Sequence, residues 1–474
     1  MHCTTSSSYK YILHVRITSI TSSSSTRPRT MLRALLLLLT TAALLSGHAA
    51  SGTGSGDKPT PPCWPADRAA LLGFKAGIAV DTTGILSTWA GDDCCGGGWE
   101  GVACDAATGR VVSLRLESQP GRHMSGTISP SIGGLEFLEA LVIRDMGRIG
   151  GAVPSTLSRL TRLQQLYVEG NALAGGVPGK VLSRMSSLRY LSLAGNRLEG
   201  TLPPELGDVR GLEQINLAGN RLTGAVPSSY RNLSSLAYLD LSSNRLSGIV
   251  PEFVGRRFKS LALLDLSNNS FSGEMPASLY ALRNLADLSL SHNKIAGRIP
   301  PQVGSLRSLS SLSLNDNLFV GPIPKSLFGL QKLWRLDLSK NKLTGALPDF
   351  AGGGSLKWLD VSKNAIGGQI PSSISKLQGL ERLDVSRNRV GGVIPATMAA
   401  MASLEWLDLS SNAIVGRIPE NFTRMAGVRH ASFRGNKLCG QIPQAAPFNR
   451  FPAAAYAHNL CLCGKPLPPC RKIN

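Results

Sequence analysis

Hydrophobic and polar positions repeat along most of this chain with one short period. The phrase Leu-x-x-Leu-x-Leu-x-x-Asn recurs, as in residues 236–244 (LAYLDLSSN), and its asparagine returns every 23 to 25 residues. Within the phrase, the last two leucines alternate with polar residues, which predicts a short strand with one buried face. A unit of this length cannot bury its apolar face alone, so we expect consecutive units to stack with their strands in one parallel sheet. The asparagines are Asn171, Asn196, Asn220, Asn244, Asn269, Asn293, Asn317, Asn341, Asn364, Asn388, Asn412 and Asn436.

The second half of each unit reads Gly-x-(Ile/Val/Leu/Met)-Pro, in thirteen copies from residues 151–154 to 440–443. Glycine permits a tight bend, and proline fixes φ where no amide donor is needed. Leucine-spaced segments that follow, such as 278–282, predict a helical turn on the convex side. We expect each asparagine amide to satisfy backbone groups of its own coil and of the next coil. The asparagines are therefore interpreted as scaffold and not as a site.

The length of the chain would suggest several globular domains, but the short repeat period predicts one elongated solenoid of about fourteen coils. At about 4.8 Å between strands the inner sheet is roughly 60 Å long, which suits a macromolecule or polymer better than a metabolite. The first two coils are irregular, with an insertion at 117–125 and Met146 near the place of an asparagine, which is typical of terminal repeats. The coils begin at Val111, Leu138, Leu163, Leu188, Leu212, Leu236, Leu261, Leu285, Leu309, Leu333, Leu356, Leu380, Leu404 and Val428.

The first fifty residues do not share the repeat pattern. Residues 1–30 are rich in Ser and Thr, and Met31-Leu-Arg33 opens onto an apolar stretch from Ala34 to Leu45 that ends in small residues. This order is typical of a secretory signal peptide, and the apolar stretch is short for a bilayer span. We predict an N-terminal extension and signal peptide over 1–50 with the start codon at Met31, then a spacer over 51–62; the alternative is an unusually long signal region.

Eight cysteines follow the predicted signal in two clusters of four, one before and one after the repeats. In an exported chain this even count favours disulfides over metal ligation, and each cluster allows three pairings. The clusters predict an N-terminal cap over 63–110, repeats over 111–438 and a C-terminal cap over 439–474, since end coils expose unpaired strands and leucines. In the first cap, Asp67 is predicted to N-cap an amphipathic helix. The cysteines are Cys63, Cys94, Cys95, Cys104, Cys439, Cys461, Cys463 and Cys470.

The repeat phrase LxxLxLxxNxLxGxIPxxLxxLxxL resembles the plant extracellular subclass of leucine-rich repeats over residues 111–443. The N-terminal flank, with the 65–72 segment, Trp89, Trp99 and its cysteines, resembles the plant N-terminal repeat cap. The end, 460–470, resembles plant DNA-damage-repair/toleration proteins and polygalacturonase-inhibiting proteins. The resemblance implies an α/β solenoid: a right-handed leucine-rich-repeat superhelix with a parallel concave β-sheet and disulfide-bonded caps. It also implies the pairs Cys63–Cys94, Cys95–Cys104, Cys439–Cys461 and Cys463–Cys470.

The charge balance is strongly basic. Residues 1–50 hold five of the 50 basic residues and none of the 30 acidic ones, which leaves about +15 on the mature chain. Such a field favours acidic partners and speeds encounter with them. For a secreted protein we expect a protein or acidic polysaccharide ligand, and no nucleic acid, because the compartment is wrong. Since only residues 471–474 follow the last cysteine, no membrane span is expected.

Catalysis is not expected, and neither is a cofactor or a metal. Four histidines of the mature chain lie in different coils, and no Gly-x-Ser-x-Gly, Walker or zinc-binding spacing occurs. A column of aspartates that includes Asp337, Asp360, Asp384 and Asp408 is part of the generic LDLS phrase and is interpreted as scaffold. Binding is the default function for this inventory.

The candidate ligand patch lies on the predicted concave face of coils 10 to 14, about 19 Å along the sheet. Three of the six tryptophans fall there at positions predicted to face water, and Trp and Arg dominate interface hot spots. The alternative is that the tryptophans pack on each other or on glycan and bind nothing. The candidate residues are Trp334, Arg335, Lys357, Trp358, Arg382, Trp406, Arg429 and His430.

Three sequons, at Asn232, Asn268 and Asn421, are predicted glycosylation sites in the secretory path. Asn232 and Asn421 fall in the convex half of their coils, so glycan there leaves the concave face open.

Together these features predict a secreted recognition protein of the plant cell wall with a concave binding face and a role in defence. Its sharpest version is inhibition of a microbial polygalacturonase. The alternatives are a soluble partner of a receptor ectodomain in defence or development, and a binder of anionic pectin.

Overall fold

The computed structural model describes residues 61–352 and 354–470. The chain divides into two units, Met1–Pro59 and Thr60–Asn474. The predicted extension, signal peptide and start at Met31 lie outside the described residues, as does most of the spacer 51–62. Over the described ranges, no helix is long and apolar enough to cross a membrane.

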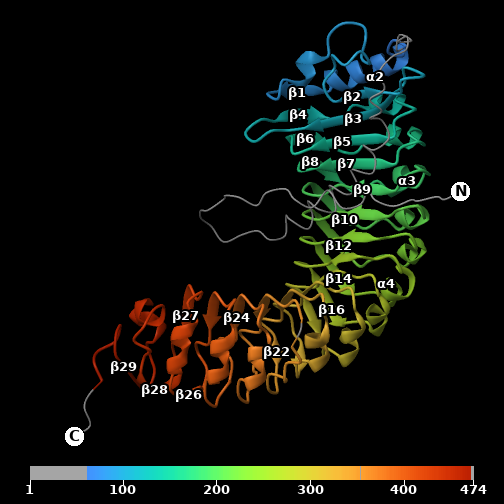
Figure 1. The fold of residues 1–474 in the computed structure, drawn as a ribbon. Coiled ribbons are helices and arrows are strands. Elements are labelled where there is room, and N and C mark those ends of the chain that lie inside the picture. Colours follow the sequence, from blue (N-terminus) through green and yellow to red (C-terminus); the bar gives the residue numbers. More distant parts are fainter. Residues whose placement is uncertain (1–60, 353, 471–474) are drawn as a thin grey trace, which may run out of the picture. The chain divides into compact units, whose positions relative to one another are not determined.

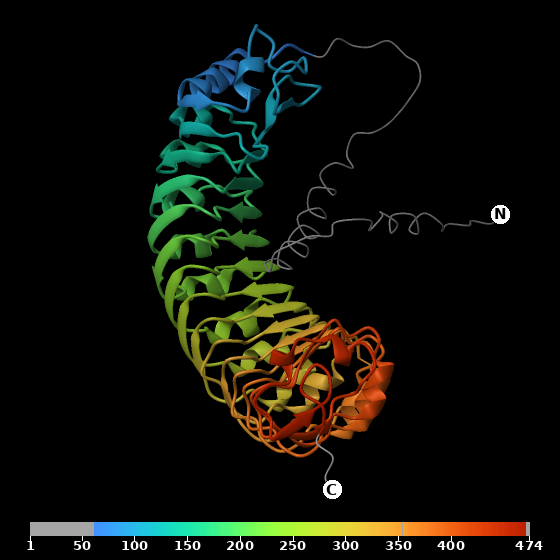
Figure 2. The same ribbon diagram turned by 90° about the vertical axis from the view of Figure 1, so that its left-hand side faces the viewer.

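The second unit is a right-handed leucine-rich-repeat solenoid whose coils stack from the N-terminal cap, coloured blue, to the C-terminal end, coloured red (Figures 1 and 2). Its concave sheet has fifteen strands among the described residues. Fourteen run parallel, one from each coil, and β2 of the cap pairs antiparallel with β3. The strands, in order, are β2 (Val102–Cys104), β3 (Val111–Glu117), β5 (Ala140–Arg144), β7 (Gln165–Glu169), β9 (Tyr190–Ser192), β11 (Gln214–Asn216), β13 (Tyr238–Asp240), β15 (Leu263–Asp265), β17 (Asp287–Ser289), β19 (Ser311–Ser313), β21 (Arg335–Asp337), β23 (Trp358–Asp360), β24 (Arg382–Asp384), β25 (Trp406–Asp408) and β27 (His430–Ser432).

A second sheet follows the asparagine of each coil, where the sequence predicts only a bend. Nine strands pair in it, and after β18 the ladder continues as isolated bridges and two short sheets. Glycines near the ends of these strands adopt a left-handed backbone conformation, with φ of 81° at Gly200 and 83° at Gly248. The strands are β1 (Ile78–Asp81), β4 (Met124–Thr127), β6 (Gly147–Gly151), β8 (Ala172–Gly175), β10 (Arg197–Thr201), β12 (Arg221–Gly224), β14 (Arg245–Ile249), β16 (Ser270–Glu274) and β18 (Lys294–Ala296), then β20 (Val320–Gly321), β22 (Lys342–Leu343), β26 (Val415–Gly416), β28 (Lys437–Gln441) and β29 (Cys461–Cys463).

Short helices cover the convex side, as the leucine-spaced segments predict. Most are single 3-10 turns that begin directly after the proline of the Gly-x-Φ-Pro phrase, as η6 begins after Pro276. The α-helices are α2 (Pro65–Ala76), α3 (Gly179–Leu182) and α4 (Glu252–Arg257). The 3-10 helices are η1 (Ile85–Thr88), η2 (Pro130–Gly134), η3 (Ser155–Arg159), η4 (Pro204–Asp208), η5 (Ser228–Asn232), η6 (Ala277–Ala281), η7 (Pro301–Ser305), η8 (Lys325–Gly329), η9 (Ser372–Lys376), η10 (Ala396–Ala400), η11 (Glu420–Arg424), η12 (Phe448–Arg450) and η13 (Ala453–Ala455).

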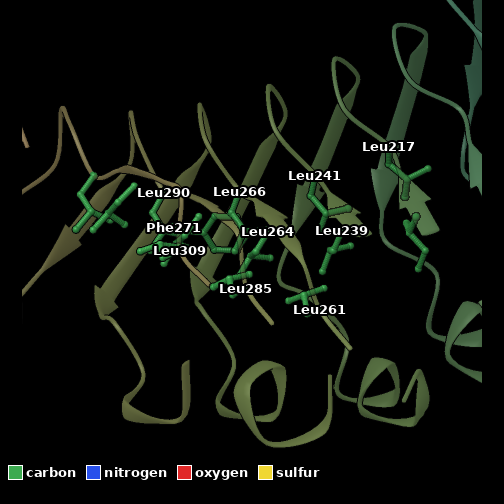
Figure 3. Packing of buried hydrophobic residues seen from close by; sticks show 14 of the residues in the cluster. Leu217, Leu239, Leu241, Leu261, Leu264, Leu266, Phe271, Leu285, Leu290 and Leu309 are labelled. Carbon is green, nitrogen blue, oxygen red and sulfur yellow. The ribbon is translucent and has the colours of Figure 1, made fainter. Parts of the chain in front are cut away.

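The core is a continuous strip of leucines inside the coils. In Figure 3, the strand leucines Leu239 and Leu264 point into the coils, toward Leu261 and Leu285. All of these leucines have exposed fractions of 1 % or less. Burial of each such side chain contributes about 1.5–3 kcal/mol, so stacking of neighbouring coils stabilises every unit.

The asparagine ladder corrects one expectation. Asn220 donates from Nδ2 to the carbonyls of Leu217 and Ala218 in its own coil and to Leu193 of the preceding coil, at 3.1, 3.3 and 2.9 Å. Its Oδ1 accepts the backbone N–H of Leu198, also in the preceding coil. The prediction of a bond to the next coil was wrong in direction, because each asparagine completes the turn of the coil before it.

The N-terminal cap corrects a second expectation. Asp67 lies inside α2, where Trp64 is the N-cap residue, and its side chain is fully buried. It accepts two bonds from the Arg110 guanidinium, at 2.9 and 3.0 Å, and one from the backbone N–H of Val111. Asp67 therefore ties the cap helix to the first repeat strand and does not cap the helix.

Disulfides close both caps. Cys63 is bonded to Cys94 and Cys95 to Cys104 at the N-terminal end, and Cys439 to Cys461 and Cys463 to Cys470 at the C-terminal end. These are the pairs that the resemblance implies. In the second cap Asn459 accepts from Leu438 N–H and donates to Phe433, so it forms one more rung of the asparagine ladder.

Candidate functional site

Five candidate residues occupy the same position on five successive concave strands. Arg335, Trp358, Arg382, Trp406 and His430 each begin their strand, and the register pairs each with the next. Side chains at equivalent positions of neighbouring parallel strands lie one strand spacing apart, so planar groups there can stack. We call these five residues the arginine–tryptophan stack.

Guanidinium and aromatic planes alternate along the stack. The Trp358 ring lies 4.6 Å from the Arg335 guanidinium carbon and 4.5 Å from that of Arg382. Arg382 also lies 4.2 Å from the Trp406 ring, whose other neighbour is the His430 ring at 3.6 Å and 13°. Cation–π contacts of this kind contribute about 0.5–2 kcal/mol each. The stack is therefore a rigid ribbon across coils 10 to 14.

The stack corrects the expectation of open aromatic faces. Trp358 and Trp406 are half-buried, because both faces of each indole are covered by a neighbour in the stack. The two tryptophans hold adjacent coils together, since each lies between side chains of the neighbouring strands. Part of each side chain stays exposed, but its indole Nε1 is buried and has no hydrogen-bond partner among the described residues. Elsewhere in the same row, Gln214 and Tyr238 are buried as well, at 8 % exposed.

The remaining predicted residues lie in a second row, one position before the strands. Trp334 precedes β21 there and is half-buried, in register with Lys357 and not with the stack. Lys357 pairs with Glu381 at 2.8 Å, and Arg429 lies 3.8 Å from Glu405. These pairs are exposed, and such pairs contribute about 0–1 kcal/mol. The eight candidates thus separate into a five-residue stack and a flanking charged row.

A row of carboxylates runs beside the stack, two residues further along each strand. Asp337, Asp360, Asp384 and Asp408 are in register on β21, β23, β24 and β25. Asp337 and Asp384 lie 3.7 Å from the arginine of their own strand. Asp360 follows a tryptophan, and burial, then the charges of Asp337 and Asp384, raise the pKa of its carboxyl to about 6. We call these four residues the aspartate row.

The aspartates also have structural roles, as the generic phrase predicts. Asp384 accepts the backbone N–H of Ser386 at 3.0 Å and its hydroxyl at 2.7 Å, and Asp360 accepts the backbone N–H of Ser362. Burial raises the pKa of Asp384 too. At the end of the stack, burial lowers the pKa of His430, with Arg382 acting in the same direction and Asp408 against it. A neutral imidazole at pH 7 suits its face-to-face contact with Trp406.

The positive charge of the chain lies away from this patch. The concave positions just described carry six carboxylates, counting Glu381 and Glu405, against four Lys and Arg side chains. The exposed cations instead follow the asparagine ladder, at the first residue of many second-sheet strands. We call them the basic row: Arg197, Arg221, Arg245, Lys294, Lys342, Arg389 and Lys437, all exposed. An acidic ligand stays an expectation, and these exposed cations are the groups that would contact it.

The described residues form a curved scaffold of stacked coils with one continuous concave sheet, which is the architecture of a solenoid repeat protein (Figure 1). Family comparison identifies the scaffold. The leucine rich repeat N-terminal domain matches residues 65–105, and the leucine rich repeat matches 161–222, 210–255, 234–295, 307–366 and 354–414, more than half of the chain. The chain belongs to the leucine-rich-repeat family.

Its relatives include plant proteins. The chain is 38% identical over 102 residues to DNA damage-repair/toleration protein DRT100 of Arabidopsis thaliana, across 19% of this chain and 27% of that protein. It is 39% identical over 93 residues to a polygalacturonase inhibitor of Vitis vinifera, across 19% and 26%. The alignments thus span about a quarter of the length of these relatives.

Among solved structures, the chain is similar to the Arabidopsis receptor kinase HAESA in complex with the peptide hormone IDA and the co-receptor SERK1. The TM-score is 0.62 with 29% identity, over 80% of this chain and 71% of that one. The similarity extends through most of the repeats and establishes the ectodomain-like architecture.

Proposed function

We propose that this protein is a secreted recognition protein that binds a protein or cell-wall ligand on the concave face of coils 10 to 14. The observation that carries the proposal is the arginine–tryptophan stack. Its Trp and Arg side chains are the types that dominate binding hot spots, and they are already held in place by one another. A preorganised surface loses little side-chain entropy on binding, which favours affinity.

The charges around the stack constrain the ligand. Because carboxylates outnumber cations six to four at the concave positions named above, a neutral or basic protein surface is favoured there over an acidic one. The sharpest form of the proposal is inhibition of a microbial polygalacturonase, supported by the similarity to a grapevine polygalacturonase inhibitor. The alternative is a soluble partner in receptor signalling, supported by the similarity to a peptide-hormone receptor ectodomain.

Enzyme inhibition is tested by mixing the secreted protein with microbial polygalacturonases and measuring the release of reducing ends. If an enzyme is inhibited, Trp358→Ala and Trp406→Ala should each weaken inhibition at least tenfold. The matched control is Trp64→Ala, which removes a half-exposed tryptophan of the N-terminal cap. Full inhibition by both stack variants, with unchanged thermal unfolding, overturns the assignment to the stack.

The compartment belongs to the same proposal. Four disulfides support an oxidising, extracellular location. The predicted signal peptide and sequons support secretion to the cell wall as a glycoprotein. Immunolocalisation of the full chain, with and without residues 1–50, tests this location directly.

Binding of anionic pectin is a second candidate, favoured by the basic row. In three consecutive coils Arg197, Arg221 and Arg245 are exposed at equivalent positions, about one strand spacing apart. A linear polyanion would contact them in series, and salt would weaken the contact. The triple change R197E/R221E/R245E should abolish retention on pectate, whereas Trp358→Ala should not. Equal retention of the triple variant rejects this candidate.

A further inference from the structure

A polar groove lies at the edge of the concave sheet in coils 4 to 6. These coils precede those of the arginine–tryptophan stack, which spans coils 10 to 14. The volume of the groove is about 480 Å³, and its lining includes Ser186, Ser187, Arg189, Gly211, Glu213 and Ser235. Ligand sites for small molecules have volumes of about 300–1,000 Å³. The groove is thus large enough for a small oligomer.

Small residues border the groove. The position just before the first leucine of each coil is occupied by Ser187, Gly211 and Ser235 in coils 4 to 6. In coils 2 and 3 the same position carries Phe137 and Arg162, whose ring and guanidinium stack at 4.0 Å. Small residues also occupy this position in later coils, such as Ser260 and Ser308, so they leave the edge of the sheet open without by themselves defining the groove.

A fixed ion pair forms one wall. Arg189 Nη1 donates to Glu213 Oε1 at 2.9 Å, and the Tyr190 hydroxyl donates to Glu213 Oε2 at 2.9 Å. These two hydrogen bonds therefore fix the orientation of the Glu213 carboxylate. The Arg189 side chain lines the groove and is still 57% exposed, so its guanidinium keeps N–H groups open to solvent. Because the two charges cancel, the wall offers donors and acceptors without net charge.

The rest of the lining offers hydroxyl and amide groups. The hydroxyls of Ser186, Ser187 and Ser235 make no hydrogen bond to any other described residue, and Gln164 adds an amide. No lining residue is apolar, so the groove has no pocket for the apolar anchor of a peptide. Its chemistry matches a ligand that presents many hydroxyls and no charge.

We propose that this groove binds a neutral oligosaccharide of hexose or pentose units. Paired hydroxyls of the sugar would bond to the Arg189–Glu213 pair, and the serine hydroxyls and Gln164 would contact the next unit. The site lies in other coils than the proposed concave patch and on another surface than the basic row. Its occupancy is independent of both.

The test is titration of the secreted protein with cellotetraose, xylotetraose and mannotetraose, followed by saturation-transfer NMR and calorimetry. Tetragalacturonate is the charged comparison. Gly211→Trp fills the groove without backbone strain, because a Cβ there meets only Leu188 O at 3.6 Å. Gly379→Trp is the matched control: it has the same place in coil 12, where a Cβ meets only Leu356 O at 3.9 Å.

At least one neutral tetrasaccharide should bind, at least tenfold more weakly to Gly211→Trp and with unchanged affinity to Gly379→Trp. Glu213→Gln, which preserves volume, should also weaken binding, and Trp358→Ala should not. The proposal is overturned if no neutral tetrasaccharide binds, or if Gly211→Trp binds as the parent does. It is also overturned if tetragalacturonate binds in the groove more tightly than every neutral sugar.

Discussion

Asp67 and Arg110 form a two-point ion pair that joins the cap helix to the first strand of the solenoid. The carboxylate is fully buried and also holds the backbone N–H of Val111. Removing one partner of such a pair leaves an uncompensated buried charge. We expect Asp67→Ala to lower the free energy of unfolding by about 3–5 kcal/mol, measured by urea denaturation.

A nearby surface pair provides the control. Arg68 lies 2.9 Å from Asp92, whose side chain is 98% exposed. Asp92→Ala should change stability by less than about 1 kcal/mol. Similar losses in the two variants would show that burial of Asp67 does not decide its contribution.

The asparagine ladder makes a second prediction. Asn220→Ala removes three donated bonds and one accepted bond inside the solenoid. Each buried backbone group left without a partner costs about 1–3 kcal/mol, so a large shift in the urea midpoint is expected. Asn284→Ala removes one exposed bond to Lys259 and should have little effect. A midpoint for Asn220→Ala equal to that of Asn284→Ala would contradict the ladder's role.

The centre of the arginine–tryptophan stack gives a third testable prediction. Arg382 covers one face of Trp358 and one face of Trp406. Arg382→Ala should expose one face of each tryptophan and so raise acrylamide quenching of tryptophan fluorescence. The loss of the two contacts should destabilise the protein by about 1–4 kcal/mol. Arg382→Lys should not restore the parent values, since an ammonium lacks the planar face. Arg389→Ala in the exposed basic row is the control, and equal quenching in the two alanine variants would refute the stack.

The raised pKa of Asp360 gives a prediction with a definite sign. A carboxyl whose pKa rises to about 6 on folding binds more protons when folded, so stability falls as pH rises from about 4 to about 6. Asp360→Asn imitates the protonated form and keeps an acceptor for Ser362 N–H. The variant should be more stable than the parent at pH 7 and equal to it near pH 4. Urea denaturation at each pH measures the difference, and a gap that does not change with pH would contradict the assignment.

The sequons differ in accessibility. Asn232 is exposed at the end of η5, whereas Asn421 is half-buried and donates from Nδ2 to Ala396 O at 3.1 Å. We therefore expect higher glycan occupancy at Asn232 than at Asn421 in the secreted protein. Peptide mass spectrometry after enzymatic deglycosylation in heavy-oxygen water measures both. The reverse order would show that the folded contacts do not govern occupancy.

The repeat architecture was predictable because its signal is carried by apolar residues at fixed spacing. The second sheet was not, since a strand such as β18 (Lys294–Ala296) has a single buried side chain, Ile295, and so shows no alternation of apolar and polar residues. The role of Asp67 was missed for another reason. Its partner Arg110 lies 43 residues away, and a polar residue near a helix start has the local pattern of a cap.

The candidate site was predicted in position but not in character. Each residue of the stack was placed on the concave face, yet reading along one strand shows only a tryptophan beside polar neighbours. The signal is in the column: Arg335, Trp358, Arg382, Trp406 and His430 alternate cation and ring at equal register. The groove at Gly211 has no such signal, because small residues stand at the same position in later coils, such as Ser260 and Ser308.

The backward direction of the asparagine bonds gives the solenoid a growing end. A coil emerging from the ribosome keeps an open backbone N–H just after its own asparagine until the next asparagine is in place, as Leu198 N–H bonds to Asn220 Oδ1 of the following coil. The newest coil is therefore always the unfinished one, and the last is completed only by Asn459 of the cap. A chain that stops at any internal coil would therefore have complete turns in all coils but the last. Only the C-terminal cap, through Asn459, supplies the final set of asparagine bonds.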